Sequence, residues 1–265
     1  MGSPTELSEA ELKRRQAHSL WLTGHTLRSE KDAIQFVKTV GIALRYNATP
    51  SLPLAAMYRA AGETRRAIEL TNRLLATGEA IETNVIADRL VLVHRSLAAP
   101  VLALRQRRRA TLSSTADRVL GLIQTDGHAS AGDVRRFLEV QGTRRPDAAD
   151  LALTELQRDL LIDRGPSSLP KKGIAYMSPE GYPYRIFETT HPDVVRAARK
   201  LSGPAATSIL IDTYLRSAVF VTERKLSSMF KLLFSDAEMK VAIDELIASK
   251  RLAKHGRVVC AAPLG

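Results

Sequence analysis

The sequence predicts an α+β, mainly helical protein in which a unit of three short helices, closed by a strand-rich stretch, recurs three times. Three observations carry this prediction: apolar residues at helical spacing, capping residues in front of the helical runs, and hairpin patterns at the ends of the units. Three helices and a hairpin make up a winged helix, a helix-turn-helix with a β wing. We therefore expect three tandem winged-helix domains at 1–110, 111–200 and 201–265.

The third unit has the clearest pattern. Its first helix is expected after Pro204, and Thr222 and Ser235 are in position to start the next two. Residues 251–262 alternate around His255-Gly256, which predicts a hairpin that turns there. Apolar residues at spacings of three and four define the buried faces of the helices: Ile211, Tyr214, Leu215 and Ala218; Leu226, Met229, Phe230 and Leu233; Met239, Ala242, Ile243 and Leu246.

The middle unit shows the same order with a longer wing. Ser113 or Ser114 is expected to cap the first helix, Ser130 with Asp133 the second, and Pro146 to lie at the start of the third. Residues 165–183 contain too many glycines and prolines for a helix, which predicts a long wing. Residues 184–189 are expected to form its returning strand.

The first unit is expected to carry an extra helix and a basic connector. Helices are predicted at 8–24, from Ser29 to Gly41, from Ser51, and at 63–76, and wing strands at 80–94. An apolar stretch at 97–104 then leads into the basic connector at 105–109.

Composition and charge narrow the class of protein. The chain has 265 residues, 45% of them hydrophobic, which is typical of a globular protein. It contains no apolar run of the roughly 18 residues that a membrane span needs and no signal-peptide pattern. The single cysteine, Cys260, excludes an internal disulfide. These features are typical of a cytoplasmic protein.

The chain is strongly basic, with a net charge of +11 and a high arginine content. A basic surface attracts polyanions, and on a winged-helix layout it favours DNA over a membrane surface. A single cluster can equally be an ordinary solvated face. The expected DNA-contacting residues are Arg45, Arg107, Arg108, Arg109, Arg135, Arg136, Arg144, Arg145, Lys171 and Lys172.

Motifs of common enzymes are missing from the sequence. It has no nucleotide-binding glycine loop, no nucleophile elbow and no HExxH or CxxC pair. Its six histidines are scattered, so neither a metal nor another cofactor is expected.

Three stretches resemble the bacterial AlkZ/YcaQ-like family, whose founding members are DNA glycosylases that remove alkylated bases and unhook crosslinks. LALTELQRDLLIDRG (Leu151–Gly165) is similar to the third helix and wing of the family's middle unit. ILIDTYLRSAVFVTERKLSSMF (Ile209–Phe230) is similar to the start of its last unit, and AIQFVKTVGIALRYNATPSLPLAAMYRA (Ala33–Ala60) to its first unit. The resemblance implies a bacterial protein with the family's tandem winged-helix fold and a role in DNA repair.

The resemblance also implies where catalytic residues would lie. The family's first unit carries Gln-x-Gln or Gln-x-Asp shortly after a glycine, to position water at the damaged nucleotide. The corresponding stretch here, Gly41–Pro50, contains neither. Tyr46 and Asn47 are the only candidates there, and neither matches the signature. We therefore expect the chain to share the family's fold but not its activity.

We accordingly expect a non-catalytic DNA-binding protein that contacts duplex or damaged DNA through phosphates. One alternative is a diverged DNA glycosylase acting on alkylated or crosslinked bases. Another is a module in which the winged helices bind a protein partner. The oligomeric state is open, and a monomer is compatible with the sequence.

Overall fold

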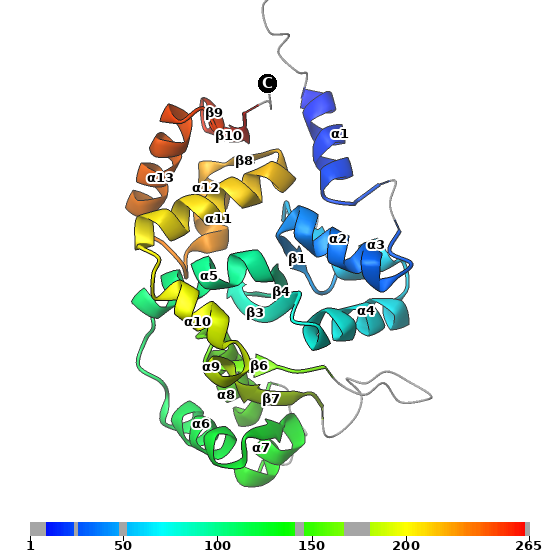
Figure 1. The fold of residues 1–265 in the computed structure, drawn as a ribbon, viewed down its shortest axis with the longest axis vertical. Helices are drawn as coiled ribbons and strands as arrows, with labels where there is room; N and C mark the ends of the chain where they lie inside the picture. Colours follow the sequence, from blue (N-terminus) through cyan, green and yellow to red (C-terminus); the bar gives the residue numbers. More distant parts are fainter. Residues whose placement is uncertain (1–8, 24–25, 48–51, 141–145, 167–180, 263–265) are drawn as a thin grey trace, which may run out of the picture.

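The computed structural model describes residues 9–23, 26–47, 52–140, 146–166 and 181–262. Within these ranges the strands form one sheet of four strands and two of three. Figure 1 shows residues 114–137 at one end of the long axis and residues 236–261 at the other. The protein is α+β and mainly helical, as predicted.

The first unit is built on the four-stranded sheet, in which β4 lies between β1 and β3 and is antiparallel to both. Ser29 caps α2 together with Asp32, and Gly41 ends the helix with a φ of 69°, which favours glycine. The elements are α1 (Glu9–Ser19), α2 (Glu30–Val40), β1 (Ile42–Leu44), β2 (Ala55–Ala56), α3 (Met57–Ala61), α4 (Thr64–Ala76), β3 (Ala80–Ile86) and β4 (Arg89–His94).

The middle unit follows a long helix, α5 (Arg95–Arg107). Ser113, Ser130 and Asp147 cap its three helices, and each accepts a backbone N–H with its side chain. Strand β7 pairs antiparallel with both β5 and β6. The elements are α6 (Ser114–Asp126), β5 (His128–Ser130), α7 (Ala131–Phe137), α8 (Ala148–Arg158), β6 (Ile162–Arg164) and β7 (Pro183–Ile186).

Two short helices, α9 (Phe187–Thr190) and α10 (Pro192–Ala198), lead to the third unit. Here Thr222 and Ser235 cap the second and third helices, as predicted. Strand β10 lies between β8 and β9. The elements are α11 (Gly203–Ala218), β8 (Phe220–Thr222), α12 (Glu223–Phe230), α13 (Asp236–Ala248), β9 (Leu252–His255) and β10 (Val258–Ala261).

One order of connection is common to the three units. A helix leads into a short strand, two helices and two further strands, and the last strand lies between the other two. The first unit departs from this order by one additional strand, β2, between its short strand and its two helices. The short first strands β1, β5 and β8 were not expected, because three residues are too few for a recognisable alternation.

Several predicted bounds need correction. The helix expected at 8–24 covers only α1, and the one expected from Ser51 begins at Met57 because β2 precedes it. Pro146 lies before the cap Asp147 and outside α8. The connector expected at 105–109 is partly the last turn of α5, and α9 and α10 follow the returning strand.

The buried apolar residues show which units are packed together. The middle unit has a hydrophobic core of its own, around Val119, Ile123 and Leu156. A second core joins strands of the first unit to α5, α10 and α11, and includes Val93, Leu102 and Leu210. The first and third units therefore share one hydrophobic core, to which Leu160 of the middle unit also belongs. A further cluster around Phe36 and Leu74 lies within the first unit.

Polar contacts reinforce the junction of the first and third units. The Tyr214 hydroxyl donates to the carbonyl of Pro53 at 3.1 Å, and the Ser217 hydroxyl donates to the carbonyl of Val40 at 3.0 Å. In the part of the chain that the structure describes, no helix is long and apolar enough to cross a membrane.

Candidate nucleic-acid interface

A buried polar cluster joins the first unit to the middle unit. Arg45 follows β1, Glu82 lies in β3, Arg164 ends β6, and Tyr182 precedes β7. The side chains of Arg45 and Glu82 have no exposed surface. Both Arg45 and Arg164 form ion pairs with the Glu82 carboxylate. One carboxylate thus holds two guanidinium groups from different units.

Tyr182 and Gln157 complete this cluster. Arg45 donates to the Tyr182 hydroxyl at 2.8 Å, and the Arg164 guanidinium lies 3.8 Å from the centre of the Tyr182 ring. The Gln157 amide donates to the backbone carbonyl of Glu82 at 3.1 Å. Burial raises the pKa of Glu82, whereas Arg45 and Gln157 oppose that shift. Burial disfavours the charged carboxylate, and the hydrogen bonds and ion pairs from its neighbours favour it.

Arg45 lies in the stretch where the resemblance places the glutamine signature. Its backbone N–H donates to the carbonyl of Leu90, and its guanidinium is directed at Glu82 and Tyr182. A guanidinium only donates hydrogen bonds, so it offers no acceptor to a water. The expectation that Arg45 grips a phosphate is corrected here, because the side chain is fully buried and paired.

Tyr46 and Asn47 follow Arg45 in the sequence and lie at the surface. Tyr46 is 43% exposed, and its ring meets that of Tyr58 edge to face with the centroids 5.1 Å apart. Burial of the phenol raises the pKa of Tyr46 to about 12, so it is protonated at neutral pH. Asn47 is exposed. Neither group is a base at neutral pH, because a neutral amide and a neutral phenol hold their protons.

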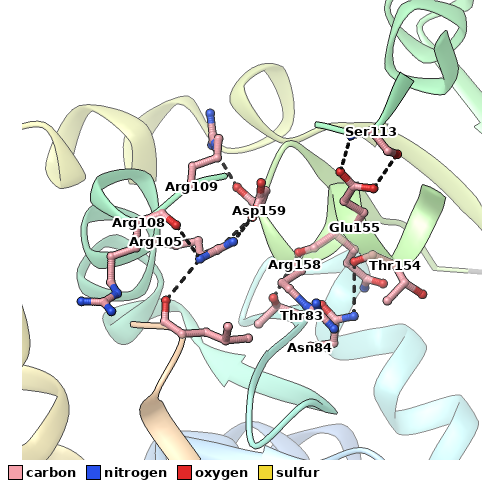
Figure 2. Close-up of polar contacts among 12 residues, drawn as sticks. Thr83, Asn84, Arg105, Arg108, Arg109, Ser113, Thr154, Glu155, Arg158 and Asp159 are labelled. Carbon is pink, nitrogen blue, oxygen red and sulfur yellow. Dashed lines mark hydrogen bonds and ion pairs between the residues drawn. The ribbon is translucent and has the colours of Figure 1, made fainter. Parts of the chain in front are cut away.

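The arginines at the end of α5 serve mainly to join the units. Arg105 is buried and pairs with Asp159, and it also donates to the carbonyl of Leu232 at 3.3 Å. Arg109 donates to the backbone carbonyl of Asp159 at 2.9 Å, while the Arg108 side chain points the other way (Figure 2). Partial burial lowers the pKa of Arg109.

All three predicted contact residues here, Arg107, Arg108 and Arg109, are exposed. Arg108 is exposed and pairs with Glu238 at 3.2 Å. Arg107 is exposed, and its guanidinium lies against Gly203, where a Cβ atom would meet it at 1.9 Å. A surface ion pair such as that of Arg108 with Glu238 contributes little to stability. The arginine can therefore readily bind another anion instead.

Arg135 and Arg136 are neighbours with different environments. Arg135 is 9% exposed and bridges Asp147 at 2.8 Å and Asp150 at 2.5 Å, which ties α7 to the start of α8. The prediction of a DNA contact is corrected for Arg135, because its charge is already neutralised inside the unit. Arg136 is exposed and pairs with Asp133. The remaining predicted contacts lie outside the described residues: Arg144, Arg145, Lys171 and Lys172.

The third helix of the middle unit is not a free surface. The Thr83 hydroxyl donates to the carbonyl of Gln157 at 3.2 Å, and the Asn84 amide donates to the carbonyl of Thr154 at 3.3 Å (Figure 2). Strand β3 of the first unit therefore covers one side of α8. The side of α8 that carries Thr154 and Gln157 is therefore packed against the first unit.

The β3–β4 turn of the first unit contacts both other units. Asp88 in this turn pairs with Arg158 of the middle unit at 3.8 Å and with Lys231 of the third unit at 2.7 Å. The backbone N–H of Ala87 donates to the carbonyl of Met229 at 2.7 Å. The turn is thus a three-way contact between units.

The sequence patterns did not reveal the buried partners of Arg45 or an exposed basic cluster on the third unit. Glu82, Arg164 and Tyr182 carry no local signal, because their partners are far away along the chain. Arg224, Lys225, Lys254 and Arg257 form a basic group on the third unit, and the predicted hairpin turn at His255-Gly256 could have indicated it. No group of three or more His, Cys, Asp or Glu side chains in the described ranges could hold a metal ion.

Comparison with known proteins agrees with this description of the fold. No protein-family model matches the chain, and no curated protein matches it. Among solved structures, the chain is similar to the Streptomyces sahachiroi DNA glycosylase AlkZ, with a TM-score of 0.58 and 13% sequence identity over 94% of this chain and 67% of that chain. This similarity shows the fold.

Proposed function

We propose that this protein binds duplex DNA, intact or damaged, through phosphate contacts and does not cleave glycosidic bonds. Three features support binding: the net charge of +11, a fold similar to that of a DNA glycosylase, and exposed arginines such as Arg107 and Arg136. Each of the three units is proposed to be a winged helix, which is a common DNA-binding plan.

The proposal that the protein does not cleave glycosidic bonds rests mainly on the environment of Arg45. It is fully buried, and its guanidinium donates to Glu82 and Tyr182. Glycosidic hydrolysis needs a water that is held and polarised beside an extruded nucleotide. A buried cation with two protein partners does not hold such a water, and Glu82 is sealed behind it.

A diverged glycosylase is the second candidate, because Tyr46 and Asn47 are exposed beside the buried cluster. In that case Asn47 would hold the water. The fold similarity to a DNA glycosylase is compatible with either function.

Two measurements test the proposal. The affinity for a labelled duplex is measured from roughly 50 to 200 mM salt. Each phosphate that the protein neutralises adds about −0.9 to the slope of log affinity against log salt concentration. An affinity that is independent of salt, or no binding at all, would overturn the binding proposal and favour a protein-interaction module.

The second measurement is release of a methylated purine from labelled duplex by the wild type and by Asn47→Ala. No release above the protein-free control is expected from either protein. Multiple-turnover release by the wild type that is lost in Asn47→Ala would establish the glycosylase instead.

A further inference from the structure

The third unit carries a basic group at its hairpin and an acidic helix, α13. Basic residues gather where the β9–β10 hairpin meets the start of α12. We call this group the wing-tip cluster, and it consists of Arg224, Lys225, Lys254, His255 and Arg257. Without counting His255, the cluster carries four positive charges.

Contacts with Glu223 hold the wing-tip cluster together. Lys254 Nζ lies 2.7 Å from the Glu223 carboxylate, and the backbone N–H of Glu223 donates to the carbonyl of Arg257 at 3.1 Å. The hairpin tip is thereby fixed against the first turn of α12. Glu223 offsets one of the four positive charges, so the cluster keeps a clear excess.

The wing-tip cluster is open to solvent. Arg224, Lys254, His255 and Arg257 are exposed. Gly256 at the turn has a φ of +61°, and a Cβ added there would meet nothing within 4 Å. The hairpin tip is therefore not covered by other parts of the described chain at Gly256.

The third helix of the same unit has the opposite charge. Helix α13 buries Met239, Ala242, Ile243 and Leu246 and carries its charged residues on the other sides. These charged residues are four carboxylates and a single lysine: Asp236, Glu238, Asp244, Glu245 and Lys240. One of the carboxylates, Glu238, is paired with Arg108. Phosphates would be repelled along this helix, because like charges close together disfavour association.

We infer that the third unit contacts duplex DNA phosphates with its wing-tip cluster, and that α13 faces away from the DNA. This inference rests on the proposed DNA binding and adds the orientation of one unit. It is the reverse of the usual helix-turn-helix docking, in which a recognition helix enters the major groove. The contact carries no base information, because lysine and arginine here would meet only phosphates.

The test compares two variants with the same change in net charge. Lys254→Gln with Arg257→Gln removes two positive charges from the wing-tip cluster. Lys240→Glu makes the same change of charge on α13. Both substitutions are at exposed positions, and thermal unfolding of each variant checks that it is folded.

Binding to one labelled duplex is measured as a function of salt. The wing-tip variant is expected to lose about two units of log–log salt slope, which corresponds to a loss of roughly ten- to one-hundred-fold in affinity near 0.1 M salt. Lys240→Glu is expected to keep the wild-type slope.

A wrong orientation of the third unit and a failure of DNA binding itself would give different results. Equal effects of the two variants, or no effect of the wing-tip variant on a wild type that binds DNA, would overturn the orientation proposed here and leave DNA binding intact. A wild-type protein that does not bind DNA would overturn the proposed function itself.

Discussion

The guanidinium of Arg45 and the carboxylate of Glu82 form an ion pair in which neither side chain has any exposed surface. Arg164, from the middle unit, shares the same carboxylate. The pair therefore lies inside the first unit and at its junction with the middle unit. A buried charge is costly unless it is paired and hydrogen-bonded, so each member depends on the others.

Replacing Glu82 by glutamine should destabilise the protein strongly. The change leaves two guanidinium groups without their carboxylate, and breaking a buried pair typically costs about 3–5 kcal/mol. The free energy of unfolding is measured in urea. The control is Glu69→Gln, which removes the partner of Arg65 in an exposed pair at 3.1 Å and should cost less than about 1 kcal/mol. Equal costs for the two variants would show that the buried cluster contributes nothing special.

Arg45→Gln introduces the family's residue type and should still yield no base release. The glutamine would be enclosed by Glu82 and Tyr182, where an extruded nucleotide has no access to it. The assay is release of a methylated purine under multiple-turnover conditions, with the wild type in parallel. Activity gained by this single substitution would mean that the site is otherwise intact and that the cluster is open to DNA.

Arg144 and Arg145, which precede α8, are predicted from the sequence to contact phosphates. Replacing both with glutamine should weaken binding to unrelated duplexes by the same factor, because phosphate contacts are independent of sequence. The salt slope should fall by about one unit for each arginine that binds a phosphate in the wild type. Lys240→Glu serves again as the control for net charge. An unchanged affinity in the double variant would place these arginines away from the DNA.

The cap of α7 should make stability depend on pH. Hydrogen bonds from Ser130 lower the pKa of Asp133 below its usual value. A carboxyl group whose pKa is lower in the folded state stabilises the protein above its unfolded pKa, near 4, and loses this effect as pH falls through its folded pKa. Asp133→Asn should therefore cost a few tenths to about 1 kcal/mol at neutral pH. Urea unfolding at pH 7 and near pH 3 should show the difference between the two proteins shrinking in acid, whereas a constant difference would contradict this.

Local signals in the sequence were sufficient for most of the helices. Ser29 with Asp32 and Ser235 with Glu238 form capping boxes at α2 and α13, and the apolar spacing gives the buried faces of both helices. Such signals act within a few residues. The repeated layout followed from them, although β1, β5 and β8 are too short to be detected.

The fate of individual arginines could not be predicted in this way. Arg135 and Arg136 are adjacent in the sequence, yet one is buried between two aspartates and the other is exposed. The difference depends on Asp147 and Asp150, which approach only when α8 packs on α7. Arg45 is a similar case, because its partner Glu82 is brought to it by the pairing of strands. Charge clusters in a sequence therefore overestimate the surface available to DNA.

The hydrophobic core that the first and third units share has a consequence for synthesis of the chain. The middle unit has a core of its own. Apolar residues such as Leu102 and Val93 are covered by partners from α11 and beyond. During translation these surfaces would remain uncovered until the C-terminal part has left the ribosome. We therefore expect chains cut short before α11 to aggregate or to be held by chaperones, whereas the middle unit can complete its own core earlier.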